Sequence, residues 1–292
     1  MMHALRWIWA AAWLAPIALA QGQTDVSFLL APRNGRMSFR LGESVDVEFR
    51  LASSLPGRYR IWTTSGTRYV RISRFDKVLV EPAQTVVDPL RDIPAQFEGG
   101  VVAGVPPTPV PLTAVPMVFE RHVNEWISFR QPGRYRITVE TTRVETTAQP
   151  PASVTLRSNP IEIEIVAPEA GWAAAQLRQA VAMLERGDPP PPVIGQTIQG
   201  SVEQARTEEM AHAGRVLRFL ETRDAMPALA RFFEHGPQAA QQEIRAGLFA
   251  SPYRKEVIAA MEESIAAPGT PVTYYYLATL MELAAASRMG PS

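Results

Sequence analysis

The sequence contains no cysteine. This absence excludes disulfide bonds, zinc sites built on thiolates, cysteine nucleophiles, thioesters and the lipid-modified cysteine of a lipoprotein. A chain without such cross-links is held together by its hydrophobic core alone.

The sequence also lacks an excess of charge of either sign. Its 29 lysine and arginine residues balance its 29 aspartate and glutamate residues, so a polyanion or an anionic membrane meets no overall attraction. Among the basic residues only Lys77 and Lys255 are lysine. Arginine suits bidentate recognition of phosphate, but these arginines are spread along the chain among acidic residues. We attribute their number to codon bias and predict no nucleic-acid binding.

Residues that carry chemistry are scarce. Beyond the first 20 residues the only histidines are His122, His212 and His235. Glu208 and His212 share a helix face, but two ligands do not make a metal site. The sequence has no Gly-x-Ser-x-Gly elbow, no His-Glu-x-x-His helix and no calcium loop. We therefore predict no catalytic residue, no metal and no cofactor.

A hydrophobic run that could span a membrane is missing too. At the N-terminus Arg6 precedes an uncharged stretch over 7–19, and the small residues Ala18 and Ala20 precede Gln21. This pattern is typical of a signal peptide, and the stretch is shorter than the roughly 20 apolar residues that a membrane anchor needs. We predict a signal peptide over 1–20 with cleavage before Gln21. The mature chain is then periplasmic or secreted, without a transmembrane segment.

What the sequence does contain divides it into two parts. Residues 21–168 include 9 alanines, whereas residues 169–292 include 24. Alanine favours helices and is depleted in strands. The composition predicts a β domain over 21–168, a helix and proline-rich linker over 169–200, and a helical domain over 201–292.

The first part shows the period of two that is typical of half-buried strands. Val45, Val47 and Phe49 alternate with polar residues, which places one face of a strand in a core. Similar runs predict strands over 26–30, 44–52, 59–64, 69–75, 125–129, 134–144, 154–157 and 161–166. Eight short strands separated by turns indicate a β-sandwich.

A short repeat supports an immunoglobulin-like sandwich. The segment Pro-Gly-Arg-Tyr-Arg-Ile occurs over 56–61 and again over 132–137. We interpret it as one turn-and-strand device used twice in a single sandwich, and the alternative is two duplicated small modules. Tyr135 at the start of its strand is similar to the tyrosine corner of immunoglobulin-like domains, which implies a structural role.

The segment 81–118 interrupts the strand pattern with eight prolines and a glycine-rich run over 99–104. No Lys-Ser or Lys-Thr pair follows the glycines, so the phosphate-binding loop motif is absent. We expect a long loop that covers a sheet edge or meets a partner, since proline discourages pairing between sheet edges.

The second part is helical. An amphipathic pattern predicts a helix over 172–186, and proline-rich residues 188–192 follow it as a stiff linker. A longer helix is predicted over 201–221, and Ser251-Pro252 and Thr270-Pro271 are typical of helix starts. The apolar pattern recurs at an offset of 29 residues. Residues 203–288 resemble HEAT-like repeats, an α-solenoid of stacked helix pairs, and the alternative is a plain helical bundle.

A broader resemblance joins the two parts. Asn124-Glu125-Trp126-Ile127-Ser128-Phe129, Pro132-Gly133-Arg134-Tyr135-Arg136 and Ser158-Asn159-Pro160-Ile161, followed by Leu217-Arg218-Phe219-Leu220, are similar to segments of uncharacterised exported proteins of acidobacterial type. The resemblance implies a β-sandwich followed by HEAT-like helices and no known activity. Members of that group continue into further helices.

These observations favour a non-enzymatic exported protein that acts by protein–protein interaction or scaffolding. Its predicted partner is an unidentified envelope or extracellular protein, or a second copy of the chain. Tyr274, Tyr275 and Leu280 on the last helix are the predicted partner-binding residues. The alternative is a glycan-binding protein or hydrolase with carboxylates between the domains. A stacking role of Trp126 on a sugar would suit that alternative, but its position in a strand pattern favours the sandwich core.

Overall fold

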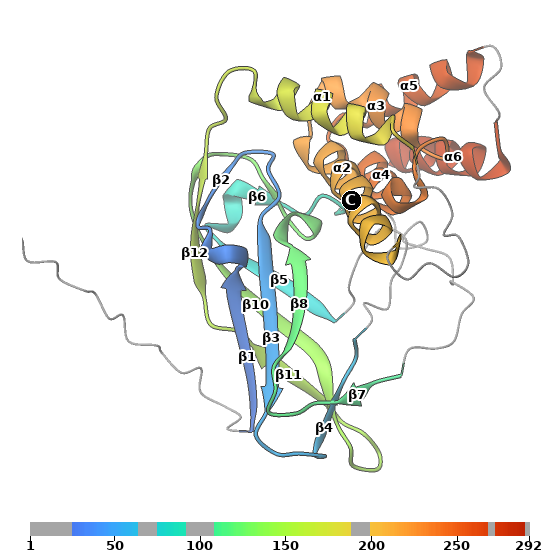
Figure 1. Ribbon diagram of the computed structural model, residues 1–292. Coiled ribbons are helices and arrows are strands. Elements are labelled where there is room, and N and C mark those ends of the chain that lie inside the picture. Colours follow the sequence, from blue (N-terminus) through green and yellow to red (C-terminus); the bar gives the residue numbers. More distant parts are fainter. Residues whose placement is uncertain (1–24, 64–74, 92–107, 188–198, 268–271, 290–292) are drawn as a thin grey trace, which may run out of the picture.

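The computed structural model describes residues 25–63, 75–91, 108–187, 199–267 and 272–289. Its N-terminal region is rich in β-strands, and its C-terminal region is helical (Figure 1). The predicted signal peptide over 1–20 and the predicted proline-rich linker over 188–192 both lie outside the described residues.

The described residues of the β-rich region form two main sheets and a small third one. A three-stranded antiparallel sheet has the order β1 (Val26–Pro32), β3 (Asp46–Ser53), β8 (Met117–His122). The order of the larger sheet is β2 (Ser38–Arg40), β12 (Ile161–Val166), β10 (Gly133–Thr146), β4 (Tyr59–Ile61), β7 (Val110–Pro111), with β5 (Asp76–Glu81) and β11 (Ser153–Arg157) also paired to β10. A third sheet pairs β6 (Val86–Val87) with β9 (Ser128–Phe129).

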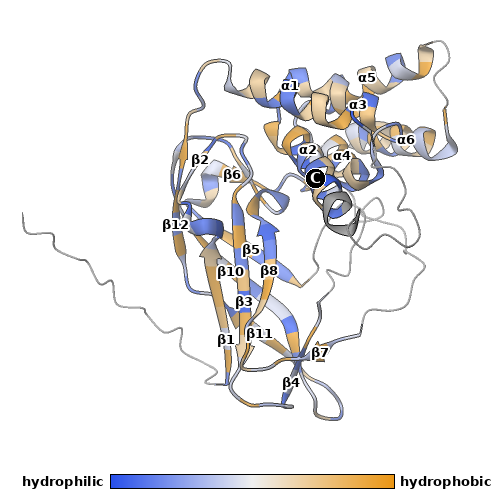
Figure 2. Ribbon diagram, viewed as in Figure 1, coloured by the Kyte–Doolittle hydropathy of each residue, from blue (hydrophilic) through white to orange (hydrophobic). Residues whose placement is uncertain are grey.

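Alternation along the strands builds the core of this region. In β3 the side chains of Val47, Phe49 and Leu51 are buried, while Glu48 and Arg50 between them are more exposed. Figure 2 shows the resulting change between hydrophobic and hydrophilic residues along the strands. The buried apolar side chains of both main sheets form one cluster, in which every member lies between residues 26 and 165. The β-rich region therefore has a hydrophobic core of its own.

The long strand β10 also carries a buried ion pair. Arg143 and Asp76 have fully buried side chains, and their charged groups approach to 2.5 Å. The Thr141 hydroxyl donates a further hydrogen bond to Asp76 at 2.7 Å. A buried charge without a partner is strongly unfavourable, so each group requires the other.

Six helices form the C-terminal region of the described chain. They are α1 (Trp172–Leu184), α2 (Gln199–Leu220), α3 (Met226–Phe232), α4 (Gln238–Ala250), α5 (Arg254–Ala266) and α6 (Tyr274–Met289). Alternate helices lie side by side, α2 against α4 and α3 against α5, while α1 packs on α2 and α6 on α5. Among the described helices, none has the length and apolar character needed to cross a membrane.

Several sequence predictions require correction. The strand predicted over 125–129 is wrong at its start, because Val123–Glu125 form a 3₁₀ turn and only Ser128–Phe129 pair as a strand. The predicted loop over 81–118 contains β6, β7 and the first residues of β8. The strand predicted over 69–75 lies almost entirely outside the described residues.

Candidate functional site

The two regions meet where the 3₁₀ turn and β9 face the C-terminal end of α2. The Ser128 hydroxyl donates a hydrogen bond of 2.6 Å to Glu221, and Arg130 forms an ion pair of 2.8 Å with the same carboxylate. The rings of His122 and Phe219 lie 6.3 Å apart. This polar and aromatic contact joins residues about 90 positions apart in the sequence, and it defines the junction between the regions.

Glu221 occupies an unusual position at this junction. It follows directly after α2 with a φ of 45°, a left-handed conformation that non-glycine residues adopt rarely but that often ends a helix. Its burial raises the pKa of its carboxyl group, whereas Arg130 and Ser128 lower it. The turn thus directs the carboxylate of Glu221 toward the β-rich region, where both of its partners lie.

A cavity of about 240 Å³ opens beside this ion pair. Phe129, Trp172 and Phe219 contribute aromatic surface to it, and Asn124 and Arg130 contribute polar groups. Pockets for small molecules usually measure about 300–1,000 Å³. The only carboxylate among the lining residues is Glu221, and its Oε2 atom accepts hydrogen bonds from Ser128 and Arg130. The cavity therefore lacks the pair of carboxylates that glycoside hydrolysis requires.

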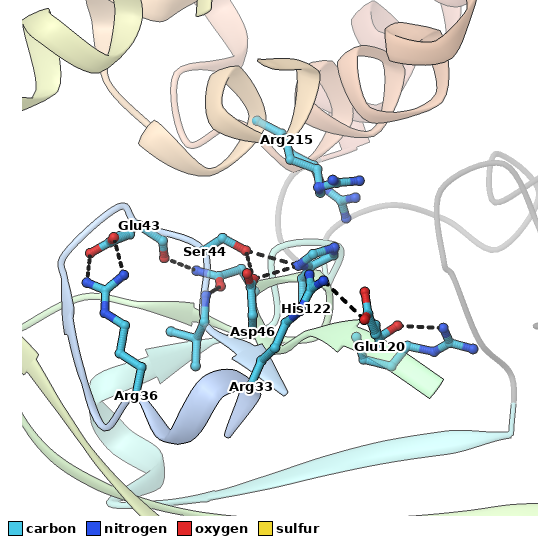
Figure 3. A network of polar contacts seen from close by, with 12 residues as sticks. Arg33, Arg36, Glu43, Ser44, Asp46, Glu120, His122 and Arg215 are labelled. Carbon is cyan, nitrogen blue, oxygen red and sulfur yellow. Dashed lines mark hydrogen bonds and ion pairs between the residues drawn. The ribbon is translucent and has the colours of Figure 1, made fainter. Parts of the chain in front are cut away.

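Ser44, Asp46 and His122 come together beside the junction (Figure 3). Ser44 Oγ lies 3.1 Å and Asp46 Oδ1 lies 2.7 Å from the same ring atom, His122 Nδ1. The Ser44 hydroxyl also donates to Asp46 at 2.5 Å. In a serine hydrolase the histidine contacts the acid with one ring nitrogen and the serine with the other. Here both contacts use Nδ1, so the arrangement does not activate Ser44 as a nucleophile.

Glu125 is a second buried acid at the junction. Its side chain is 7% exposed, and Oε2 has no hydrogen-bond partner among the described residues. Burial raises the pKa of Glu125 to about 7, against the opposing influence of Arg218, His122 and Arg121. Arg218 itself bonds to Glu243 of α4 at 2.9 Å.

The polar residues of the junction do not form a metal site. No group of three or more potential ligands occurs within the described parts of the chain. Glu208, which the sequence places near His212, bonds instead to Arg215 at 2.6 Å. Burial lowers the pKa of His212, which favours its neutral form.

We interpret the junction as a contact that holds the β-rich region against α2 and α4.

The predicted partner-binding residues lie on α6, away from the junction. Tyr274 is 88% and Tyr275 is 40% exposed, whereas Leu280 is half-buried. Met281, which the sequence also places among the apolar residues of this helix, is 71% exposed. Its spacing of seven residues from Tyr274 places both on one helix face, and this signal was available in the sequence.

The exposure of Tyr274 and Met281 follows from the packing of the opposite face of α6 into the helical core. Tyr276 and Leu283, seven residues apart, are buried in the helical core. The Tyr275 ring lies between these faces, 5.6 Å from the ring of Phe233 and under the guanidinium of Arg245 at 5.2 Å. The helix over 172–186, which could have covered α6, packs on α2 instead. The outer face of α6 is therefore open among the described residues.

The predicted cleavage-site residues Ala18, Ala20 and Gln21 lie outside the described residues. No model of a known protein family matches this chain, and a search of curated protein sequences likewise finds no match.

Proposed function

We propose that this chain is an exported, non-enzymatic protein that acts by protein–protein interaction in the periplasm or outside the cell. The observation that carries the proposal is the open apolar face of α6, on which Tyr274, Leu277 and Met281 are 88%, 42% and 71% exposed. Soluble proteins rarely leave large apolar side chains clustered on a surface unless that surface binds something.

The proposed architecture is an immunoglobulin-like sandwich followed by HEAT-like helices. The Tyr135 ring is buried, and its hydroxyl donates to the carbonyl oxygen of Gln131 at 2.6 Å, as in a tyrosine corner. The side-by-side packing of alternate helices supports a stack of helix pairs. Immunoglobulin-like sandwiches and stacks of helix pairs are both scaffolds that commonly present binding surfaces.

The alternative function, glycan binding or hydrolysis between the domains, receives less support. The cavity at the junction is small and has one carboxylate among its lining residues. Trp126 does not face this cavity: it packs partly buried against the sandwich core, 6.2 Å from the Phe49 ring, and its indole N–H donates to the Asp76 carbonyl at 3.2 Å.

Affinity purification of the exported chain tests this function. The test variant combines Leu277→Glu with Met281→Glu. The matched control combines Val115→Glu with Val118→Glu, two residues of the β-rich region that are 76% and 49% exposed. We expect the native chain and the control to retain the same proteins from the envelope or medium, and the α6 variant to lose them.

Circular dichroism of the purified variants checks that each one is folded. An α6 variant that is folded and retains the same proteins as the native chain would overturn the proposed function. If only the β-region control loses binding, the interaction surface lies on the β-rich region and not on α6, which also contradicts the proposal.

A further inference from the structure

The outer face of α6 is uncharged along most of its length. At 100° per residue, one side of the helix collects seven residues: Tyr274, Leu277, Ala278, Met281, Ala284, Ala285 and Arg288. Only Arg288, at the C-terminal end, carries a charge. Two identical faces of this kind can approach each other without bringing like charges together along the contact.

Large and small side chains are separated along this face. Tyr274 and Leu277 are bulky and lie toward the N-terminal end, whereas Ala284 and Ala285 are small and lie toward the C-terminal end. Met281 lies midway, seven residues from both Tyr274 and Arg288. A helix with this arrangement matches a copy of itself that runs in the opposite direction.

An antiparallel arrangement centred on Met281 makes the match specific. It places Leu277 opposite Ala285 of the second copy, so that a large side chain meets a small one. It also places Tyr274 opposite Arg288, a pair suited to a cation–π contact. Arg288 is exposed and forms no ion pair with the described residues of its own chain. Such a contact is isologous, because each copy contributes the same surface.

We infer that two copies of this chain associate through antiparallel α6 helices around a two-fold axis at Met281. The inference rests on the proposed function and names its partner. At 88%, 42% and 71% exposure, Tyr274, Leu277 and Met281 offer roughly 400 Å² per copy, since a large aromatic side chain contributes about 150–250 Å². Two such surfaces bury about 800 Å² in total, which is less than the roughly 1,200 Å² of stable specific complexes and in the range of weak, transient ones. The dimer should therefore be weak, with a dissociation constant in the micromolar range.

The absence of cysteine allows a direct test of the axis. Met281→Cys introduces the only thiol of the chain, and two thiols at a two-fold axis come within reach of a disulfide. Val115→Cys, at a position that is 76% exposed, is the matched control. Under mild oxidation of purified protein at about 10 μM, a concentration suited to a micromolar complex, we expect the Met281→Cys variant to cross-link at least tenfold faster.

Sedimentation equilibrium gives an independent measurement. We expect the purified native chain to dimerise reversibly, Met281→Glu to be a folded monomer, and Arg288→Glu to dimerise several-fold more weakly. Equal cross-linking rates of the two cysteine variants, or a native chain that stays monomeric at about 100 μM, well above a micromolar dissociation constant, would overturn the inference.

The two proposals can fail separately. A monomeric native chain whose α6 face still binds a different envelope protein would contradict the second copy as partner and leave the proposed function standing. A monomer whose α6 variant also retains every binding partner would contradict both.

Discussion

At the scale of single residues, Glu125 shows how the junction responds to protons. Its carboxyl group is buried, and the charges of Arg218 of α2, of His122 and Arg121 of β8 and of Glu243 of α4 act on it. Burial disfavours the ionised form, and the nearby cations do not fully offset this effect. The pKa of about 7 in the folded chain is higher than the ordinary value of 4.5. Between about pH 4.5 and pH 7, the folded state therefore keeps a proton on Glu125 that the unfolded state has released.

Replacing Glu125 by glutamine tests this coupling. Ionisation of Glu125 reduces the free energy of unfolding as the pH rises from about 4.5 to about 7. At pH 8 the Glu125→Gln variant should be more stable than the native chain by up to about 3 kcal/mol, because a shift of one pKa unit corresponds to about 1.4 kcal/mol. At pH 4 the two should be similar. Urea unfolding at several pH values provides the measurement.

The comparison with the native chain isolates Glu125 from other titrating groups. His212, with a lowered pKa, destabilises the fold as the pH falls, in both proteins equally. Glu120→Gln, which removes a carboxylate from a side chain that is 55% exposed, is a suitable control. If the difference in the free energy of unfolding between Glu125→Gln and the native chain is the same at pH 4 and at pH 8, the raised pKa is contradicted.

At the scale of secondary-structure elements, glycines set how closely the helices approach. A Cβ atom at Gly247 of α4 would lie 3.0 Å from Leu229 Cδ2 and 3.1 Å from the Cα atom of Arg218. A Cβ atom at Gly214 of α2 would lie 3.1 Å from the carbonyl oxygen of Ala240. The backbone atoms among these neighbours cannot move without shifting a helix. The close contact between α2 and α4 therefore depends on glycine, which has no side chain, at positions 214 and 247.

Gly247→Ala distinguishes close packing from intrinsic helix propensity. Propensity alone predicts that alanine stabilises the helix by up to about 1 kcal/mol. Overpacking predicts a loss of about 1–3 kcal/mol, and we expect the loss to dominate because a backbone atom is among the neighbours. Thermal unfolding monitored by circular dichroism at 222 nm measures whether the substitution stabilises or destabilises the chain. A raised melting temperature would contradict the close approach of α4 to its neighbours at Gly247.

At the scale of the whole molecule, each region has a core of its own and the polar junction connects them. Leu90 is the exception, because it follows β6 in the sequence but is buried among residues of the helical core. Glu125 is likewise buried, and Glu221 partly buried, where the regions meet. The regions are thus separate in their cores and joined by a few defined contacts.

A fragment spanning residues 21–168 tests this separation. It retains every member of the β-region core, so we expect it to fold with a β-type circular dichroism spectrum and a cooperative unfolding transition. It exposes Leu90, so the fragment with Leu90→Ser should be the more soluble one. An unfolded fragment beside a folded whole chain would show that the helices belong to the same cooperative unit.

Local patterns in the sequence determined the classes of the two regions and many of their elements. The alternation in 44–52 predicts β3 because one face of a strand must enter a core, and the apolar spacing over 201–221 predicts α2 for the corresponding reason in helices. The strand β12 has the predicted bounds, Ile161–Val166. Such patterns depend only on neighbours along the chain, and they therefore appear in the sequence itself.

The tertiary structure alone decided the elements and contacts that depend on distant residues. β2 and β7 are three and two residues long, too short to show a period, and they form because β12 and β4 lie beside them. Ser128 and Glu221 meet only when the two regions pack together. The pKa of Glu125 and the open face of α6 depend in the same way on what covers each residue, and burial is a property of the folded chain.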